Sequence, residues 1–305
     1  MSEEEEDDLG IKPGTVIDSS KARYVIVKLL GEGGFGAVYK VYDEKDPKKE
    51  YAMKVEKKLE TRPHSKLKME IAILKLVSAE RKQSHFTAII DRGKKDTYFF
   101  LVMELVGKSL ADLKRLRPKK VFSISTAMGV GIQCLEACED LHKHGFIHRD
   151  LKPANYACGL GDKQRVVCPS ECLALGKKDA TFSRPFKGTI KFASIACHKN
   201  AEMGPKDDCE SWFYLVLDIT MPKGNAIKKF SDAALSGVKC KEELSKVLDY
   251  IDTLKYSDHV DYEFIYKSLT KAAKTAGGDI NQPYDWEKPA ERSKISETST
   301  GSQKP

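Results

Sequence analysis

The feature that most constrains this chain is a change of hydrophobic period near Gly107. Before it, polar and apolar residues alternate in four runs rich in Val, Tyr, Phe and Ile, at residues 24–30, 37–42, 51–56 and 97–104. Runs of this kind, separated by glycine or charged turns, predict strands. One helix is predicted between them, in residues 66–80, because apolar residues there recur three and four positions apart.

After Gly107 the apolar residues follow helical spacing. Ser123 or Ser125 can cap a helix that stops at Gly145. Three further helices are predicted: one in residues 212–219, one in residues 244–254, and one that starts near Tyr262 and ends at Gly277-Gly278. These patterns predict an α+β fold in which a small strand-rich lobe with one helix joins a larger, mainly helical lobe.

The expected boundaries follow from composition. An acidic flexible arm is predicted in residues 1–21 and a disordered, Ser/Thr/Lys-rich tail in residues 287–305. The domain between them spans residues 22–286, with the small lobe in residues 22–106 and the large lobe in residues 107–286. The chain has 52 Lys+Arg against 45 Asp+Glu; since residues 1–10 contain six acids and no base, the remainder carries a net charge of +13. This balance favours anionic partners.

Several classes of protein are excluded by composition. No apolar run approaches the roughly 20 residues that a bilayer requires, and the acidic N-terminus is unlike a signal peptide. We therefore expect a protein of the cytoplasm, the nucleus or both, with no membrane partner. The eight cysteines include no Cys-x-x-Cys pair, so we expect reduced, buried thiols rather than a zinc site.

A glycine-rich segment lies between the first two predicted strands. Glycines at positions 31, 33, 34 and 36 would let backbone N–H groups approach a phosphate chain with no Cβ in the way. The same pattern can open a dinucleotide-binding unit, but a helix must then follow, whereas residues 37–42 are strand-like. A plain hairpin turn remains the alternative.

A lysine on the next strand supports the phosphate interpretation. Strand alternation places Ala52 and Lys54 on one face of residues 51–56, and an inward lysine needs a counter-charge. Glu70 on the following predicted helix lies among apolar residues and can supply that charge. The alternative is that Lys54 and Glu70 are two ordinary surface charges.

The segment from Phe146 to Asn155 carries the strongest chemical signal. It places Asp150, Lys152 and Asn155 in one loop after a capped helix. Phosphoryl transfer needs a carboxylate to orient the hydroxyl, a cation to offset phosphoryl charge and an oxygen ligand for Mg²⁺. These three residues supply the three roles in that order.

Together these motifs resemble the eukaryotic protein kinases over about residues 22–286. The chain is most similar to the casein kinase I group and, within it, to the tau-tubulin-kinase-like branch. The segments that carry this finer resemblance are Ser194–His198, Asp207–Ser211 and Tyr284–Trp286. The resemblance implies a two-lobed kinase fold with an antiparallel small-lobe sheet, and an ATP-dependent serine/threonine protein kinase that transfers the γ-phosphate of ATP with Mg²⁺.

The resemblance also implies a role for each site residue. Asp150 would be the catalytic base, Lys152 would contact the γ-phosphate, Asn155 would bind the metal and Asp208 would brace the loop. Lys54, paired with Glu70, would hold the α- and β-phosphates. The nucleotide would be enclosed by these residues together with Leu30, Gly31, Gly33, Gly34, Gly36, Val38, Ala52, the gatekeeper Met103, and the hinge residues Glu104 and Leu105.

One departure from the family is large. No Asp-Phe-Gly occurs, and the alignment places Cys172 at the metal-binding aspartate, with Glu171 beside it. A neutral thiol is a poor ligand for Mg²⁺, and Glu171 could replace it only if the strand slips by one residue. The segment from there to Thr189 is also about ten residues short by comparison with the family. The alternatives are an active kinase, a pseudokinase that serves as a nucleotide-binding or scaffold module, and a gene model with wrong splice junctions.

The expected partners are protein substrates. The resemblance and the basic body predict substrates that are acidic or already phosphorylated near the target Ser or Thr, with Lys187, Lys191 and Lys206 near the peptide site. The basic run in residues 114–120 is predicted to be a solvated helix end and loop, or a docking patch for acidic substrates. We expect no nucleic-acid partner, since no recognised module accompanies the basic residues, and a monomer.

Overall fold

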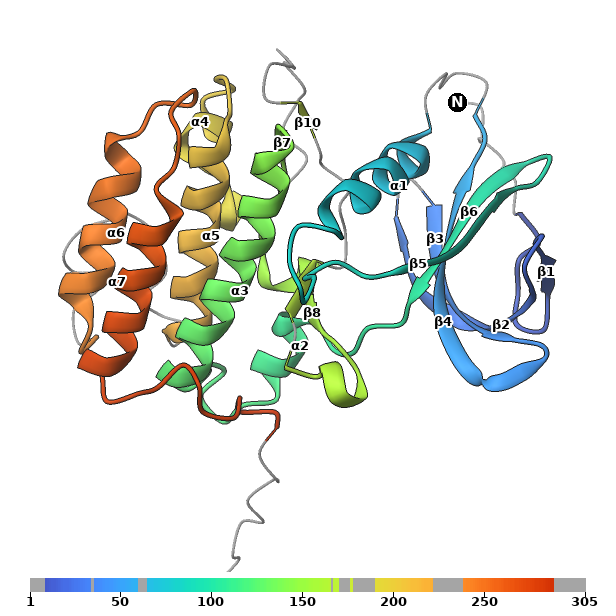
Figure 1. The fold of residues 1–305 in the computed structure, drawn as a ribbon, viewed down its shortest axis with the longest axis horizontal. Helices are drawn as coiled ribbons and strands as arrows, with labels where there is room; N and C mark the ends of the chain where they lie inside the picture. Colours follow the sequence, from blue (N-terminus) through green and yellow to red (C-terminus); the bar gives the residue numbers. More distant parts are fainter. Residues whose placement is uncertain are drawn as a thin grey trace, which may run out of the picture.

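The computed structural model describes residues 9–33, 36–59, 65–165, 167–169, 176–177, 190–221 and 238–287. A small lobe built on one sheet is followed along the chain by a larger, mainly helical lobe (Figure 1). This arrangement confirms the predicted α+β fold. Figure 1 shows the sheet and its single helix on the right, and the helical lobe on the left.

The small lobe is a six-stranded antiparallel sheet in the order β1-β2-β3-β4-β6-β5. Its strands are β1 (Val16–Asp18), β2 (Arg23–Gly33), β3 (Gly36–Asp43), β4 (Asp46–Lys57), β5 (Ile89–Lys94) and β6 (Tyr98–Glu104). Helix α1 (Lys66–Val77) connects β4 to the β5–β6 hairpin. Its amphipathic spacing is clear, because the buried residues recur every three or four positions from Leu67 to Val77.

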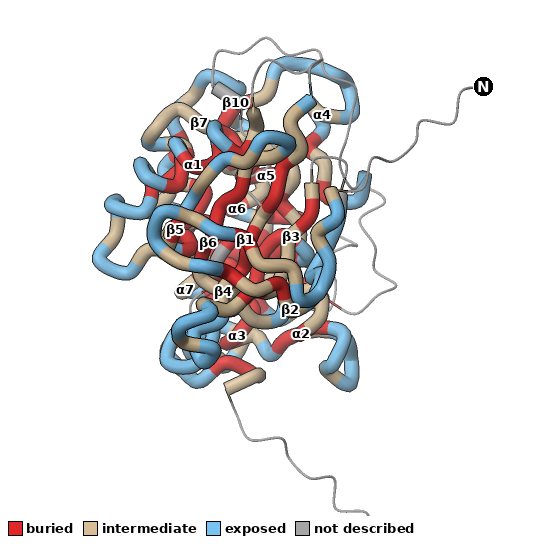
Figure 2. The backbone as a smooth tube through the Cα atoms, turned by 90° about the vertical axis from the view of Figure 1, so that its right-hand side faces the viewer, coloured by how far each residue is buried: buried red, intermediate tan, exposed pale blue. Residues whose placement is uncertain are grey.

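The large lobe is built around one buried helix, Pro205–Thr220. Its helices are α2 (Leu110–Arg115), α3 (Ile124–Lys143), α4 (Ile195–His198), α5 (Pro205–Thr220), α6 (Lys241–Thr253) and α7 (Tyr262–Thr275). Short strands β7 (Phe146–Ile147) and β10 (Gly176–Lys177) pair with each other, as do β8 (Tyr156–Cys158) and β9 (Val167–Pro169). Ser123 caps α3, so the first of the two predicted caps is the one used. Figure 2 shows buried residues along α5, whose apolar side chains are nearly all enclosed.

The sheet separates two hydrophobic clusters. Alternation along β4 sends Met53 and Val55 into a cluster on the outer face, and Ala52 into the main core that continues through α1 and the helical lobe. Lys54 therefore points to the α1 side of the sheet, as the period-two pattern predicted.

The structure differs from expectation near the N-terminus and in the basic run of residues 114–120. Residues Val16–Asp18, which we placed in the flexible arm, form β1 and pair with β2, and Ile17 is buried in the outer cluster. Lys114, which we placed in a solvated basic run, is buried and forms an ion pair with Asp218 of α5 at 2.5 Å. Residues 1–8 of the predicted arm and 288–305 of the predicted tail lie outside the described residues. No helix in the described part of the chain is long and apolar enough to cross a membrane.

Candidate nucleotide-binding and catalytic site

The glycine-rich segment forms the β2–β3 hairpin. Gly31 pairs with Val38, and Gly33 pairs with Gly36. Gly36 has φ +142°, and a Cβ at this position would lie 1.9 Å from the carbonyl oxygen of Val55, so only glycine fits beside β4. A Cβ at Gly31 would meet nothing within 4 Å among the described residues. The predicted residue Gly34 lies outside them.

Lys54 and Glu70 come together across the gap between β4 and α1. The Lys54 Nζ lies 2.7 Å from Glu70 Oε2, and their side chains are only 12% and 5% exposed. Glu70 reaches this position because it shares a helix face with the buried residues Leu67 and Leu74. The pair is a charge-assisted hydrogen bond in a place with little water, which makes it stronger than a surface ion pair.

The predicted adenine region lies at the end of β6. Met103 pairs with Ala52 of β4, and both are buried, with Val38 and Leu105 packed against the same core. In contrast, Leu30 at the start of the glycine hairpin is 45% exposed. Ala52, Met103, Val38 and Leu105 border the side of the sheet that faces α1 and the large lobe.

The side chain of the predicted hinge residue Glu104 has two partners. The Glu104 carboxylate accepts a hydrogen bond from the amide of Ala88 at 3.0 Å and pairs with Lys163 at 2.5 Å. Burial raises the pKa of this carboxyl, but the bond and charge of Lys163 and the Ala88 bond lower it below its ordinary value. The Glu104 carboxylate is therefore already occupied by Ala88 and Lys163.

The predicted catalytic loop is folded around Asp150. Lys152 Nζ lies 2.7 Å from Asp150 Oδ2, and Asn155 Nδ2 donates to the same oxygen at 3.0 Å and to the Asp150 backbone carbonyl at 2.8 Å. Among the described residues, both side-chain bonds go to Oδ2, which leaves Oδ1 of Asp150 without a protein donor. The side chains of Lys152 and Asp150 are 22% and 21% exposed, so the loop is open to a substrate.

A buried aspartate of α5 holds this loop in place. Asp208 accepts hydrogen bonds from the backbone amides of His148 at 2.5 Å and Arg149 at 2.8 Å. Arg149 has φ +69°, in the left-handed region that costs energy for a residue other than glycine. The two hydrogen bonds to one carboxylate offset that cost. They also fix the backbone that leads into Asp150.

His142 of α3 completes the support of Asp208. Its Nε2 lies 2.9 Å from Asp208 Oδ2, and its Nδ1 lies against the hydroxyl of Tyr262. Burial raises the pKa of the Asp208 carboxyl, but the hydrogen bond and charge of His142 and the His148 contacts outweigh it and hold that pKa below its ordinary value. Asp208 is thus a stable anion beneath the loop.

Of the residues considered as metal ligands, the structure describes only Asn155. Asn155 uses its amide nitrogen for both bonds to Asp150, so its amide oxygen is left for a cation such as Mg²⁺. Cys172 and Glu171, the residues aligned with the metal-binding aspartate, lie outside the described residues. Within the described part of the chain, no group of three or more His, Cys, Asp or Glu side chains could hold a metal ion.

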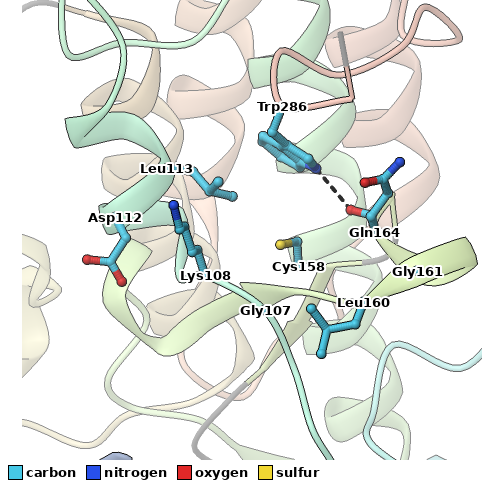
Figure 3. A pocket seen from close by; sticks show the side chains of 10 residues that line it. Gly107, Lys108, Asp112, Leu113, Cys158, Leu160, Gly161, Gln164 and Trp286 are labelled. Carbon is cyan, nitrogen blue, oxygen red and sulfur yellow. Dashed lines mark hydrogen bonds between the residues drawn. The ribbon is translucent and has the colours of Figure 1, made fainter. Parts of the chain in front are cut away.

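A separate open pocket of about 520 Å³ lies beyond the hinge (Figure 3). It is lined by the chain after the hinge, by α2, by the turn after β8 and by Trp286, whose Nε1 donates to the carbonyl of Gln164 at 2.9 Å. None of the predicted site residues lines it. This pocket is therefore not the predicted site.

Sequence reasoning missed two contacts that position α1. Glu56, two residues after Lys54 on the same face of β4, accepts bonds from the first amides of α1. Arg81, in the turn after α1, bonds to Glu139 at 2.8 Å and to Asp140 at 2.9 Å on α3. The alternation that identified Lys54 could have identified Glu56, whereas no local pattern indicates the partners of Arg81.

The chain is similar in sequence to known protein kinases. Residues 24–164 match the family model described as Protein kinase domain. A Caenorhabditis elegans protein named "Putative serine/threonine-protein kinase ZK507.3" is 32% identical over 299 residues, which cover 90% of this chain and 77% of that protein. Two more distant relatives are "Putative casein kinase I C03C10.2" of the same organism (26% identical; 92% of this chain, 86% of the relative) and "Probable casein kinase I homolog ECU11_1980" of Encephalitozoon cuniculi (28%; 81% and 84%). Since the fold, the family model and a relative above 30% identity agree, the chain belongs to the protein kinase family.

Proposed function

We propose that this protein is an ATP-dependent serine/threonine kinase of the casein kinase I group that transfers the γ-phosphate of ATP to protein Ser or Thr. The observation that carries the proposal is the loop in which Lys152 and Asn155 both bond to Oδ2 of Asp150. This arrangement leaves the second carboxylate oxygen of Asp150 to orient a substrate hydroxyl and accept its proton.

The nucleotide would lie between the lobes. The glycine hairpin would cover its phosphates with backbone N–H groups, and Lys54, held by Glu70, would contact the α- and β-phosphates. Adenine would lie against Ala52 and Met103 and bond to the hinge backbone. When bound, Mg²⁺ would offset phosphate charge, with the Asn155 amide oxygen as the ligand that the described residues offer.

Assignment to the casein kinase I group rests on the sequence segments that resemble it and on the names of two distant relatives. The corresponding substrates would be acidic or already phosphorylated. In the structure Lys191 pairs with Asp218, and Lys206 lies 3.8 Å from Glu210, so an acidic substrate would have to compete with these carboxylates. The third predicted base, Lys187, lies outside the described residues.

A pseudokinase is the second candidate. The observation that favours it is the absence of an Asp-Phe-Gly from the whole sequence, with Cys172 aligned at its aspartate. Such a protein would keep the nucleotide contacts of the small lobe and lack the carboxylate that joins Mg²⁺ to the phosphates.

Nucleotide binding is tested by calorimetry on the full chain with ATP. Lys54→Met should lower ATP affinity at least about tenfold, because it removes a charge-assisted contact to the phosphates. Lys49→Met is the matched control, since Lys49 lies on the same strand with its side chain 62% exposed. Equal affinity of wild type and Lys54→Met would contradict the proposed nucleotide site.

Catalysis is tested on the same preparations by phosphate transfer to an acidic peptide, with Asp150→Ala as the blank. Transfer by the wild type that disappears in Asp150→Ala supports the kinase. Transfer that appears only in Cys172→Asp assigns the defect to the missing carboxylate. ATP binding without transfer in any variant supports the pseudokinase instead.

A further inference from the structure

Glu56 is a buried carboxylate that bonds to the start of α1. It is 4% exposed. Its two oxygens accept hydrogen bonds from the amides of Lys66 and Leu67, both at 2.9 Å, and from the hydroxyl of Ser65. A buried charge is costly unless it is hydrogen-bonded, and here three donors satisfy it.

These contacts complete the N-terminus of α1. A helix begins with amides that have no partner inside the helix. Glu56 satisfies the first two, and Ser65 satisfies the third through its hydroxyl, 3.1 Å from the amide of Lys68. The first turn of α1 contains no acidic residue, so the negative charge that favours a helix N-terminus is provided by another strand.

The same strand face also holds the middle of the helix. Lys54 and Glu56 are two residues apart on β4, a separation of about 6.7 Å along a strand. Their partners on α1, Glu70 and the amides of Lys66 and Leu67, are three to four residues apart, about 4.5–6 Å along a helix. Strand and helix run in opposite directions here, so the two attachments lie side by side.

We propose that Glu56 is a positioning residue: it fixes the N-terminal end of α1 against β4 so that Glu70 stays within reach of Lys54. The two attachments have opposite polarity. Glu56 is an anion bound to helix amides, and Lys54 is a cation bound to the carboxylate of Glu70. A shift of α1 along its axis would break both at once. The effect on nucleotide binding rests on the proposed function, whereas the effect on Lys54 itself does not.

The experiment compares Glu56→Gln with Glu50→Gln in the full chain. Gln has the shape of Glu, but it is neutral and presents a donor to the helix amides. Glu50 is the matched control because it is on the same strand and its side chain is 44% exposed. Three readouts are used: hydrogen exchange of the first amides of α1, the rate at which the Lys54 amine is acetylated by acetic anhydride, and ATP affinity.

In Glu56→Gln we expect exchange of the Lys66 and Leu67 amides to accelerate about tenfold and acetylation of Lys54 to accelerate, while Glu50→Gln matches the wild type. ATP affinity should fall about fivefold, the scale of one anion at a helix N-terminus. Because Glu56 acts through Lys54, adding Glu56→Gln to Lys54→Met should cause no further loss of affinity.

Several results would overturn the proposal. Faster amide exchange with unchanged Lys54 acetylation would make Glu56 a helix cap only. An equal loss of ATP affinity in the Lys54→Met background would mean a general weakening of the fold. If Glu56→Gln does not fold, Glu56→Asp is used, which keeps the charge on a shorter side chain. In that variant the Lys54 amine must be acetylated faster than in the wild type, and an unchanged rate overturns the proposal. A wild type that binds no ATP, with the Lys54 result as expected, refutes the proposed function and leaves the inference standing.

Discussion

Two lysine–carboxylate pairs of the site have the same N–O distance and different surroundings. Lys54–Glu70 and Lys152–Asp150 both measure 2.7 Å. The first joins two elements and is 12% and 5% exposed, whereas the second lies within one loop and is 22% and 21% exposed. The N–O distance alone therefore does not distinguish a buried ion pair from one that a substrate can contact.

Burial decides the difference. The first pair is enclosed between β4 and α1, so each partner stays poorly hydrated when the other is removed. The second pair is partly exposed to solvent, and the backbone of its loop is held by hydrogen bonds to Asp208. We expect the first pair to contribute to stability and the second to contribute to chemistry.

The largest effect on stability is expected for Glu70→Gln. This change leaves the charge of Lys54 buried without its counter-charge, which typically costs about 3 kcal/mol of unfolding free energy. Chemical denaturation of the full chain measures it. A loss below about 1 kcal/mol, the range of exposed pairs, would remove the distinction between the two pairs.

An intermediate effect is expected at a third pair, Lys114–Asp218, and it depends on pH. Burial raises the pKa of the Asp218 carboxyl, but the bonds and charges of Lys114 and Lys191 outweigh it, so the pKa lies below the ordinary 3.8. The stability that this pair contributes is therefore present above pH 3.8 and is lost as pH falls through the lowered pKa.

As pH drops below 3.8, the unfolding free energy of Asp218→Asn should therefore decrease less steeply than that of the wild type. Denaturation at a series of pH values measures this slope. Parallel curves for variant and wild type would show that Asp218 is not the group responsible.

The smallest effect on stability is expected for Asp150→Asn. Lys152 can turn to solvent when its partner loses charge, so unfolding free energy should change by less than about 1 kcal/mol, and ATP affinity should stay close to that of the wild type. Any Asp150-dependent phosphate transfer should disappear. A stability loss as large as that of Glu70→Gln would mean that the loop pair is structural.

Local patterns were sufficient for much of the fold. Alternation predicted most of the small-lobe strands, and helical spacing predicted α1, α3, the second half of α5, α6 and α7. Strand β5 was missed because Asp91 occupies an inward position; it is buried and accepts hydrogen bonds from Tyr24 at 3.2 Å and from Ser19. A polar residue at a core position looks like a turn until its distant partners are known.

The sequence by itself determined which residues could carry phosphoryl-transfer chemistry, because Asp150, Lys152 and Asn155 lie within six residues of one another. It also indicated that Lys54 needs a counter-charge, since alternation is a local property. Only the tertiary structure decided that Glu56 caps α1, that Arg81 attaches the turn after α1 to α3, and that Lys114 is buried. Each of these contacts joins charged or polar groups that are distant in the sequence. A buried charge is costly without such a partner, so the partner determines whether the group can be buried.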